Sequence, residues 1–357
     1  MSFTITPHAS PVSPQTREKT LEDPGFGRVF TDHMVTMRWT AERGWHDGKV
    51  TARAPLAIDP ACAVLHYAQE VFEGMKAYRT AKGEIVLFRP DMNANRFARS
   101  AERLAMPAMP EALFIQAVEE LVRIDKDWVP SGAGSLYLRP FMFASEAFLG
   151  VRPAHEYIFC VIACPVGPYF KGGDKPLKLW VSDKYTRAAP GGTGAAKCGG
   201  NYAASLIAQA EAAEHGCDQV VFLDAAEHRW IEELGGMNLF FVMNDGSLVT
   251  PPLTGTILPG ITRTSLIEIA RGFGMKVSEA PYSLDQWRAD AESGKLSEAF
   301  ACGTAAVVAS IGEIVSSSGS FRVKNAQGAT VASKLKEQLV GIQRGSIADA
   351  HGWVRKV

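Results

Sequence analysis

The segment Gly191-Gly-Thr-Gly-Ala-Ala-Lys-Cys-Gly-Gly-Asn-Tyr202 is the most unusual stretch of this 357-residue chain. It places Lys197 among small residues, and no carboxylate occurs between Asp183 and Glu211. Small residues allow the backbone to lie against a flat ligand, and a lysine partly removed from water can act as an amine nucleophile. A glycine-rich surface loop with a solvated lysine explains the same composition, so composition alone leaves both interpretations open.

Two nucleotide-binding motifs are excluded in this stretch. A P-loop needs glycine directly before the lysine and Ser or Thr directly after it, whereas Ala196 and Cys198 stand there. A dinucleotide fingerprint needs G-x-G-x-x-G, and after Gly192 and Gly194 the third glycine position is occupied by Lys197.

The composition is typical of a soluble globular protein. The 37 Lys and Arg residues balance 38 Asp and Glu, which argues against a nucleic-acid binder or a polybasic membrane protein. No apolar run reaches the ~18–20 residues of a membrane span, and the N-terminus has no secretory-signal pattern. The six cysteines are scattered without a CxxC pair, so we expect buried thiols, no metal site and a cytoplasmic location.

Periodicity predicts a mixture of helices and strands. We expect strands at 35–39, 84–88, 136–144, 157–165, 177–181 and 219–223, and a hairpin of 238–243 with 247–250. We expect helices at 63–73, 91–104, 111–128, 202–214, 262–272, 284–291 and 331–341. Because both halves mix helices with hairpin-linked strands, an α+β fold is favoured over a doubly wound parallel sheet.

The chain length favours two domains, and the best boundary is the Gly- and Pro-rich stretch Pro165–Asp174. We therefore expect an N-terminal arm at 1–24, which is rich in Pro, Ser and Thr and which we expect to be loose. A small α/β domain at 25–165, an interdomain loop at 166–176 and a large lysine-bearing domain at 177–357 would follow.

Two further turns of small residues are candidate anion sites. Pro259-Gly260 leads into Ile261 and Thr262 at a helix start, where N–H groups and the positive dipole end suit an anion. An ordinary N-cap by Thr262 is an equal alternative. Gly303-Thr304-Ala305 follows an expected strand and forms a second such turn, which a plain tight turn explains as well.

Polar residues elsewhere complete the candidates. Arg96 lies in an expected helix, where a solvated position is the ordinary alternative. Glu232 and Glu233 precede an apolar strand and could pair with a buried cation or lie in a solvated turn. Tyr137 and Arg139 alternate with leucines, so they share one strand face. An arginine there suits a carboxylate, and a structural ion pair is the alternative.

Together these elements resemble the branched-chain-amino-acid aminotransferases, pyridoxal-phosphate (PLP) enzymes of fold type IV. The resemblance runs from about Phe26 to the C-terminus, and the order and spacing of its blocks make it specific. The blocks are Phe26-Gly27, Thr31-Asp-His-Met34, His66-Tyr67, Val71-Phe-Glu-Gly74, Asn93 to Phe97, Tyr137-Leu-Arg-Pro140, Ala196 to Tyr202, Glu233 to Phe240, Leu258 to Arg263 and Gly303-Thr-Ala305.

The resemblance implies a fold of two domains, each a mixed or antiparallel sheet or barrel with flanking helices, and an active site between the domains. It implies that Lys197 holds PLP as a Schiff base and moves a proton, that Tyr202 hydrogen-bonds the phenolic oxygen, and that Glu233 faces the pyridine nitrogen. Arg96, Thr304 and the backbone of Ile261 and Thr262 match the phosphate cup. Matches to the substrate region are Phe72, Tyr67, Tyr137, Arg139, Thr304 and Ala305, with Tyr202 as a further wall of the apolar pocket.

The implied reaction moves an amino group between L-leucine, L-isoleucine or L-valine and 2-oxoglutarate, giving branched-chain 2-oxo acids and L-glutamate. The resemblance also implies a homodimer, with no nucleic acid or membrane as a partner. Some animal members carry a redox Cys-x-x-Cys after the Gly-Thr-Ala block. None is present here, so Cys302 is expected to be a packing residue.

Other assignments remain open on the sequence. Within PLP chemistry they are a D-amino-acid aminotransferase, an amine transaminase and an aminodeoxychorismate lyase. A non-catalytic small-molecule-binding protein on the same scaffold is the alternative from another class, and the presence of Lys197, Glu233 and Tyr202 argues against it.

Overall fold

The computed structural model describes residues 2–167, 175–324 and 330–357. The chain forms two compact units. The first contains residues 1–169, 196–199 and 341–357, and the second contains residues 170–195 and 200–340. The lysine segment 196–199 therefore belongs to the first unit, although the residues on both sides of it belong to the second. Most of the Gly- and Pro-rich stretch Pro165–Asp174 lies outside the described residues.

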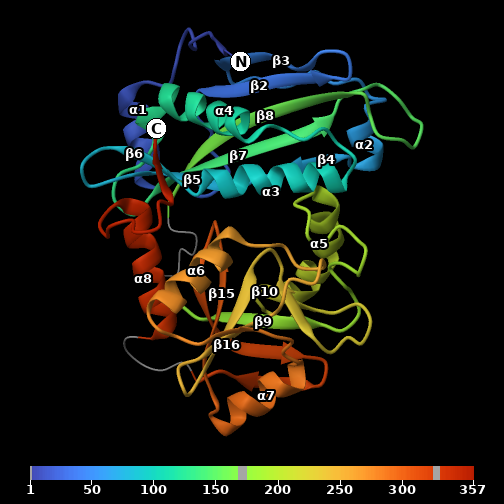
Figure 1. Ribbon diagram of the computed structural model, residues 1–357, viewed down its shortest axis with the longest axis vertical. Coiled ribbons are helices and arrows are strands. Elements are labelled where there is room, and N and C mark those ends of the chain that lie inside the picture. The colour runs from blue at the N-terminus through green and yellow to red at the C-terminus, as the bar shows by residue number, and fades with distance from the viewer. Residues whose placement is uncertain (1, 168–174, 325–329) are drawn as a thin grey trace. The chain divides into compact units, whose positions relative to one another are not determined.

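The first unit is built on a sheet with the strand order β1-β3-β2-β8-β7-β5-β6-β18, and β4 pairs with β7 (Figure 1). All pairings are antiparallel except β1 with β3. The strands are β1 (Thr4–Ile5), β2 (His33–Thr40), β3 (Gly44–Ala52), β4 (Glu70–Phe72), β5 (Met75–Arg79), β6 (Ile85–Phe88), β7 (Ser135–Ala144), β8 (Glu156–Val166) and β18 (Val354–Lys356).

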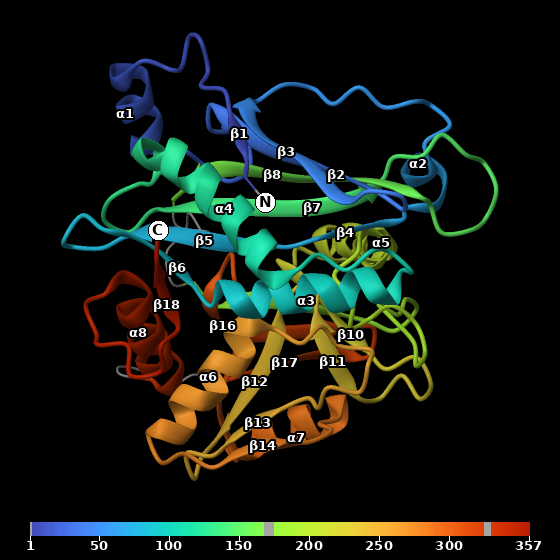
Figure 2. The same cartoon turned by 45° about the horizontal axis from the view of Figure 1, so that its top comes forward.

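One face of this sheet packs against helices α3 (Pro90–Arg103) and α4 (Glu111–Ile124), as Figure 2 shows. The core between them is aromatic: the rings of Phe97, Phe114 and Phe159 lie 5.2–6.0 Å apart. All three side chains are fully buried, and each such burial contributes roughly 1.5–3 kcal/mol to folding. The alternation along β7 sends its leucines into this core and leaves Tyr137 and Arg139 on the opposite face, as predicted.

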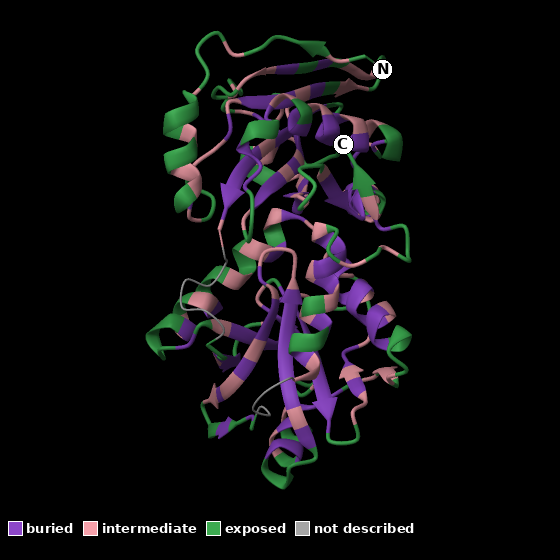
Figure 3. Ribbon diagram, turned by 90° about the vertical axis from the view of Figure 1, so that its left-hand side faces the viewer, coloured by how far each residue is buried: buried purple, intermediate pink, exposed green. Residues whose placement is uncertain are grey.

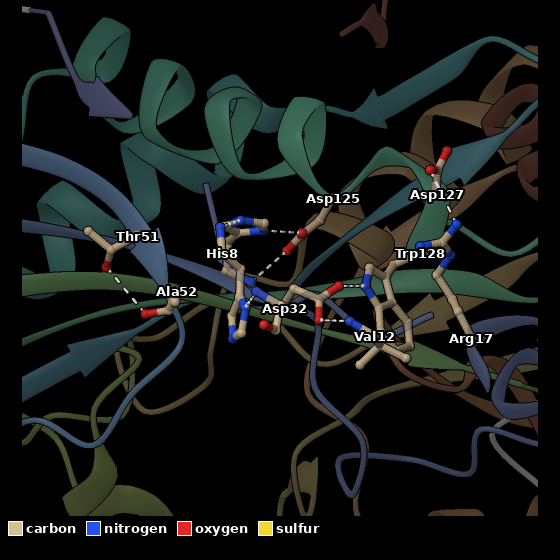
Figure 4. A network of polar contacts seen from close by, with 11 residues as sticks. His8, Val12, Arg17, Asp32, Thr51, Ala52, Asp125, Asp127 and Trp128 are labelled. Carbon is tan, nitrogen blue, oxygen red and sulfur yellow. Dashed lines mark hydrogen bonds and ion pairs between the residues drawn. The ribbon is translucent and has the colours of Figure 1, made fainter. Parts of the chain in front are cut away.

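The N-terminal arm is tied to the first unit by side-chain contacts, which its composition did not predict (Figure 4). It contains β1 and helix α1 (Pro14–Glu22). The His8 N–H donates to His33 Nε2 at 2.8 Å, and the Val12 N–H donates to Asp32 Oδ1 at 2.9 Å. The opposite ring nitrogen of His33 lies 2.6 Å from the buried carboxylate of Asp125.

The second unit is built on a mixed sheet with the order β11-β10-β9-β16-β15-β12-β13-β14, and β17 pairs with β16. β9 runs parallel to β10 and β16, while β12, β15 and β16 form antiparallel pairs. The strands are β9 (Leu177–Ser182), β10 (Gln219–Leu223), β11 (Ile231–Leu234), β12 (Asn238–Met243), β13 (Leu248–Thr250), β14 (Val277–Glu279), β15 (Leu296–Gly303), β16 (Val307–Ser316) and β17 (Gly319–Arg322).

Helices cover this second sheet. Helix α5 (Gly199–Glu214) buries Ala208 and Ala212 against Trp180, Val220 and Phe222 of β9 and β10. Helices α6 (Ile261–Gly272) and α7 (Leu284–Ser293) both pack on β15. Helix α8 (Val331–Arg344) begins in the second unit and ends in the first. The central strands are buried along most of their length, as the purple segments of Figure 3 show, and β12 is buried throughout.

Most predicted elements are confirmed, including the α+β class and the hairpin of β12 with β13. The helix predicted at 63–73 is wrong. Helix α2 (Ala63–Tyr67) ends at Ala68, which adopts a left-handed conformation with φ 48°, and Glu70–Phe72 then pairs with β7 as β4. The helix predicted at 111–128 ends at Ile124, and Lys126–Trp128 forms a separate 3-10 turn.

In the described parts of the chain, no helix has both the length and the apolar character needed to cross a bilayer. All six cysteines are buried and free, as predicted. Burial strongly raises the pKa of the Cys302 thiol, which keeps this thiol protonated and inert, in keeping with a packing role.

Candidate active site

The backbone of Lys197 is held on both sides within the first unit. Ala196 and Cys198 are buried in the core of that unit. The Lys197 N–H donates to Ser100 Oγ at 2.9 Å, and its carbonyl accepts from the Phe72 N–H at 3.0 Å. The Lys197 side chain is half-buried, and its Nζ lies 4.8 Å from the centre of the Phe72 ring. The lysine is therefore presented from a fixed backbone rather than from a solvated loop.

Gly199 lies in close contact with the side chain of Glu70. The Gly199 N–H donates to the Glu70 carboxylate. A Cβ added at Gly199 would lie 2.1 Å from Glu70 Oε1, a distance that would force the two apart. Burial raises the pKa of Glu70, while this N–H and the charge of Arg139 lower it in part.

A buried ion pair joins two of the sequence blocks. Arg96 Nε lies 2.7 Å from Glu73 Oε1, and Arg96 Nη2 lies 2.8 Å from Glu73 Oε2. Asn93 Nδ2 also donates to Glu73 Oε2 at 2.7 Å. The solvated alternative for Arg96 is excluded, because its side chain is 5% exposed and that of Glu73 is 0% exposed.

Tyr137 and Arg139 lie together on the sheet face predicted for them. Arg139 Nη2 donates to the Tyr137 hydroxyl at 3.1 Å, and the Arg139 guanidinium lies 4.7 Å from the centre of the Phe72 ring. A Cβ at Gly74 would lie 2.1 Å from the Tyr137 hydroxyl oxygen, so glycine is needed there. Lys197, Phe72, Tyr137 and Arg139 thus form one connected cluster.

Tyr67 occupies a different position. It lies in α2, is 41% exposed and donates its hydroxyl to the Leu149 carbonyl. Within the described residues, these contacts do not bring Tyr67 to the cluster around Lys197.

Lys76 is a second lysine of the first unit with unusual surroundings. It stands opposite Tyr137 in the register of β5 with β7 and is 8% exposed. Burial, together with the charge of Arg344, lowers the pKa of Lys76 to about 8. A buried lysine with a lowered pKa has the chemistry of an amine nucleophile. Lys76 is therefore a second candidate for the reactive lysine, beside Lys197, and the sequence did not indicate it.

In the second unit, Glu232 and Glu233 lie in strand β11, so the interpretation as a solvated turn is wrong. Glu233 is 1% exposed and accepts from the Leu258 N–H at 3.0 Å. Arg187 Nη1 lies 3.3 Å from the same carboxylate oxygen. Glu233 therefore has the buried cation that was one of its two predicted environments.

Arg187 connects Glu233 to the glycine-rich stretch. Its Nη1 atom also donates to the carbonyls of Gly194 at 3.2 Å and Thr256 at 2.9 Å. A Cβ at Gly194 would lie 2.3 Å from the Thr256 carbonyl oxygen, which explains the glycine. The Thr256 hydroxyl donates to Glu232 at 2.5 Å. Burial raises the pKa of Glu232, and this hydrogen bond offsets part of the rise.

The start of helix α6 has the form of an anion site. The N-cap is Gly260, with φ −67° and ψ 130°, and it provides no side-chain cap. The alternative, an N-cap by Thr262, is wrong, because Ile261 and Thr262 are already in the first turn. Asn238 Oδ1 lies 2.0 Å from where a Cβ of Gly260 would be, so a larger residue there would displace the Asn238 side chain. First-turn N–H groups and the helix dipole favour a phosphate at such an end.

The remaining predicted residues lie on elements of the second unit. Tyr202 is half-buried in the first turns of α5, and its ring passes 3.6 Å from the position a Cβ of Gly236 would take. The adjacent Asn201 anchors the glycine-rich stretch, because its Nδ2 donates to the Thr193 carbonyl at 2.8 Å. Thr304 and Ala305 are half-buried and follow β15 directly.

These groups fit PLP. The cofactor needs an amine, a buried carboxylate for its ring nitrogen and donors for its dianionic phosphate. The chain offers Lys197, the buried Glu233 and the glycine-capped start of α6. No side chain has to be displaced from the N-cap, because Gly260 has none.

Several residues of these networks were not given roles from the sequence, among them Glu73, Ser100 and Arg187. Glu73 was visible only as part of the Val71–Gly74 block. Arg187 stands four residues before the glycine-rich stretch in Thr-Arg-Ala-Ala-Pro, but its partner Glu233 is 46 positions away, a pairing that no local pattern reveals.

The chain is similar to known proteins in sequence and in fold. The family described as amino-transferase class IV matches residues 70–314. A probable branched-chain-amino-acid aminotransferase of Streptomyces coelicolor is 54% identical over 352 residues, which cover 98% of this chain and 97% of that protein.

Two solved structures have the same fold. The branched-chain amino acid aminotransferase of Escherichia coli has a TM-score of 0.76 at 28% identity, covering 90% of this chain and 98% of that one. The branched-chain amino acid aminotransferase of Thermobaculum terrenum in its PLP form has a TM-score of 0.70 at 26% identity, covering 90% and 97%. With a family match over more than half its length and a relative at 54% identity, the chain belongs to the class IV aminotransferases.

Proposed function

We propose that the protein is a PLP-dependent transaminase for branched-chain amino acids. It transfers the amino group between L-leucine, L-isoleucine or L-valine and 2-oxoglutarate. The observation that carries this proposal is the cluster of the first unit, in which Lys197, Phe72 and Arg139 combine an amine, an apolar aromatic surface and a cation. The family and the relatives with this activity support it.

Each of the chain's groups has a defined task toward the cofactor. Lys197 binds PLP through its amine and carries the proton between the substrate Cα and the cofactor. Glu233 keeps a proton at the pyridine nitrogen, and Tyr202 donates to the phenolic oxygen. Arg96, Thr304 and the first-turn N–H groups of Ile261 and Thr262 bind the phosphate. PLP, when bound, supplies the electron sink for the carbanion left by the substrate.

The substrate region has to accept two kinds of side chain. Leucine needs an apolar surface, which Phe72 offers within the cluster. Tyr67 is assigned to the same surface by the family resemblance alone, since its own contacts lie outside the cluster. 2-Oxoglutarate carries a second carboxylate. An unpaired buried carboxylate is costly, so a donor must reach it. Arg139 and the Tyr137 hydroxyl to which it donates form such a donor set. Ala305, with Thr304, provides backbone and hydroxyl donors for substrate carboxylates.

Valine, leucine and isoleucine differ by one methylene or by the position of the branch. An apolar pocket discriminates such a difference by only ~1–3 kcal/mol, so all three are accepted. We further propose a homodimer in the cytoplasm.

The experiment is a steady-state assay of the purified protein after incubation with PLP. L-Leucine with 2-oxoglutarate should yield L-glutamate, while D-alanine with 2-oxoglutarate should yield no D-glutamate. Turnover of D-alanine in place of L-leucine would assign a D-amino-acid aminotransferase. A colourless protein without turnover of either would favour a binding protein on the same scaffold.

A further inference from the structure

Glu73 is a fully buried carboxylate to which no role has been given, although it forms an ion pair with Arg96 and its charge interacts with that of Lys197. We propose that Glu73 is a positioning residue: it fixes the plane of the Arg96 guanidinium and supplies the negative charge that keeps the cofactor-linked nitrogen of Lys197 protonated. This inference rests on the proposed function, because it assigns PLP to Lys197 and its phosphate to Arg96.

Glu73 and Arg96 form a bidentate ion pair. The two contacts, 2.7 Å from Nε to Oε1 and 2.8 Å from Nη2 to Oε2, engage both carboxylate oxygens. Such bidentate pairs define the orientation of the guanidinium as well as its distance. A phosphate-binding arginine held in this way does not have to be ordered when the anion arrives.

Glu73 is itself held firmly. Asn93 Nδ2 donates to Oε2 at 2.7 Å, and the Gly74 N–H donates to the same oxygen at 3.1 Å. The Glu73 N–H donates to the Pro140 carbonyl at 2.7 Å. Both the backbone and the carboxylate of Glu73 are thus fixed by the first unit, and a carboxylate held by this many donors remains ionised.

The same contacts reach Lys197 through its backbone. Ser100 Oγ donates to the Arg96 carbonyl at 2.8 Å and accepts from the Lys197 N–H at 2.9 Å. Phe72, which directly precedes Glu73, donates its N–H to the Lys197 carbonyl at 3.0 Å. Its ring lies 4.8 Å from Lys197 Nζ. The Glu73 carboxylate, the Arg96 guanidinium and the Lys197 backbone therefore belong to one network of hydrogen bonds, and the Lys197 amine lies near the Phe72 ring.

The direction of the pKa shift of Glu73 agrees with this geometry. Burial alone would raise the pKa of Glu73. The charge and hydrogen bonds of Arg96 lower the pKa, the charge of Lys197 lowers it further, and the bond from Asn93 adds to this, so the net direction is downward.

The test is a pH titration of the visible absorption of PLP-loaded protein, in which the visible band reports the protonated cofactor-linked nitrogen. Glu73→Gln keeps the size of the side chain and removes its charge. A cation that loses a neighbouring negative charge is less stable, so the midpoint should fall by about 1 pH unit or more.

Glu119→Gln is the matched control. Glu119 is also a buried carboxylate of the first unit, paired with Arg123 at 2.7 Å and Arg355 at 2.5 Å, and belongs to helix α4. The midpoint of the pH titration of the Glu119→Gln variant should equal that of the wild type. Equal midpoints in Glu73→Gln and Glu119→Gln would overturn the proposal.

Glu73→Asp distinguishes the effect of charge from that of geometry, and it replaces Glu73→Gln as the test if that variant does not fold. Aspartate keeps the negative charge but has a side chain shorter by one methylene, so the midpoint of the pH titration should stay near the wild-type value. The dissociation constant for PLP, measured by fluorescence on the cofactor-free protein, should rise at least about tenfold, because one charge-assisted bond is lost or lengthened. Unchanged PLP affinity in Glu73→Asp would overturn the positioning role.

Failure of the proposed function itself would look different. In that case the wild type would show neither a visible band nor a PLP adduct on Lys197 after borohydride treatment. A wild type with both, combined with no midpoint shift in Glu73→Gln, would contradict only the role of Glu73.

Discussion

Replacing Arg187 by methionine should destabilise the protein far more than a typical surface change. Arg187 has a 3% exposed side chain, and its Nη1 atom contacts Glu233 and two backbone carbonyls at 2.9–3.3 Å. Methionine fills a similar space but brings no charge and no donor. The carboxylate of Glu233, 1% exposed, would then lose its buried cation.

The size of the effect follows from this burial. Removing one partner of a buried ion pair costs about 3–5 kcal/mol, because the other charge is left uncompensated. For units of this size, 1 kcal/mol corresponds to a change in Tm of ~2–4 °C, so we expect a fall of roughly 6–20 °C. The measurement is thermal unfolding of the cofactor-free protein at pH 7, followed by circular dichroism.

Arg322→Met is the matched control in the same unit. Arg322 pairs with Glu313 at 3.5 Å, but its side chain is 79% exposed. An exposed pair contributes about 0–1 kcal/mol, so the Tm should fall by less than ~4 °C. Adding Glu233→Leu to Arg187→Met should recover part of the loss by removing the unpaired charge. Equal Tm values for Arg187→Met and Arg322→Met would show that burial of the ion pair does not set the cost of breaking it.

Three further predictions address binding and pH. Arg96→Ala should lose PLP faster than wild type, since a charge-assisted contact to phosphate contributes ~1.5–3 kcal/mol; cofactor remaining after dialysis measures this, and equal retention would count against the phosphate role. Arg139→Met should raise KM for glutamate and 2-oxoglutarate much more than for leucine in steady-state assays, whereas equal losses would place Arg139 at the α-carboxylate alone. Burial raises the pKa of Asp224, but hydrogen bonds from four backbone N–H groups outweigh this effect, so the net pKa is lowered. The ionised Asp224 therefore stabilises the folded protein above the ordinary pKa near 3.8, and this stabilisation is lost as pH falls through the lowered pKa. Asp224→Ala should therefore reduce Tm at pH 7, and the difference from wild type should shrink below about pH 4; a constant difference would contradict this.

Local patterns predicted the elements that carry the site. The alternation in Ser135–Ala144 placed Tyr137 and Arg139 on one face of β7, and the structure confirms it. The helix prediction at 63–73 failed because Glu70–Phe72 is a three-residue strand, too short for a period, and its identity depends on pairing with β7. A left-handed Ala68 has no signal in the sequence.

Ion pairs between residues far apart in the chain could not be predicted from the sequence. Glu73 and Arg96 are 23 positions apart, and Arg187 and Glu233 are 46 apart. Each pair forms because separate elements meet in the folded unit, which a single sequence does not encode in any local pattern. The environment of Glu233 was open for the same reason, since Trp-Ile-Glu-Glu-Leu is compatible with a solvated turn as well as with pairing to a buried cation.

The roles proposed for the other site residues all depend on Lys197 being the lysine that carries the cofactor. Borohydride reduction of the PLP-loaded protein, followed by digestion and mass spectrometry, tests this directly by locating the trapped adduct. We expect a single adduct on the peptide containing Lys197. Lys76, whose pKa is lowered to about 8 by burial, is the informative competitor. An adduct on the peptide containing Lys76, or no adduct on any lysine, would show that Lys197 does not have this role.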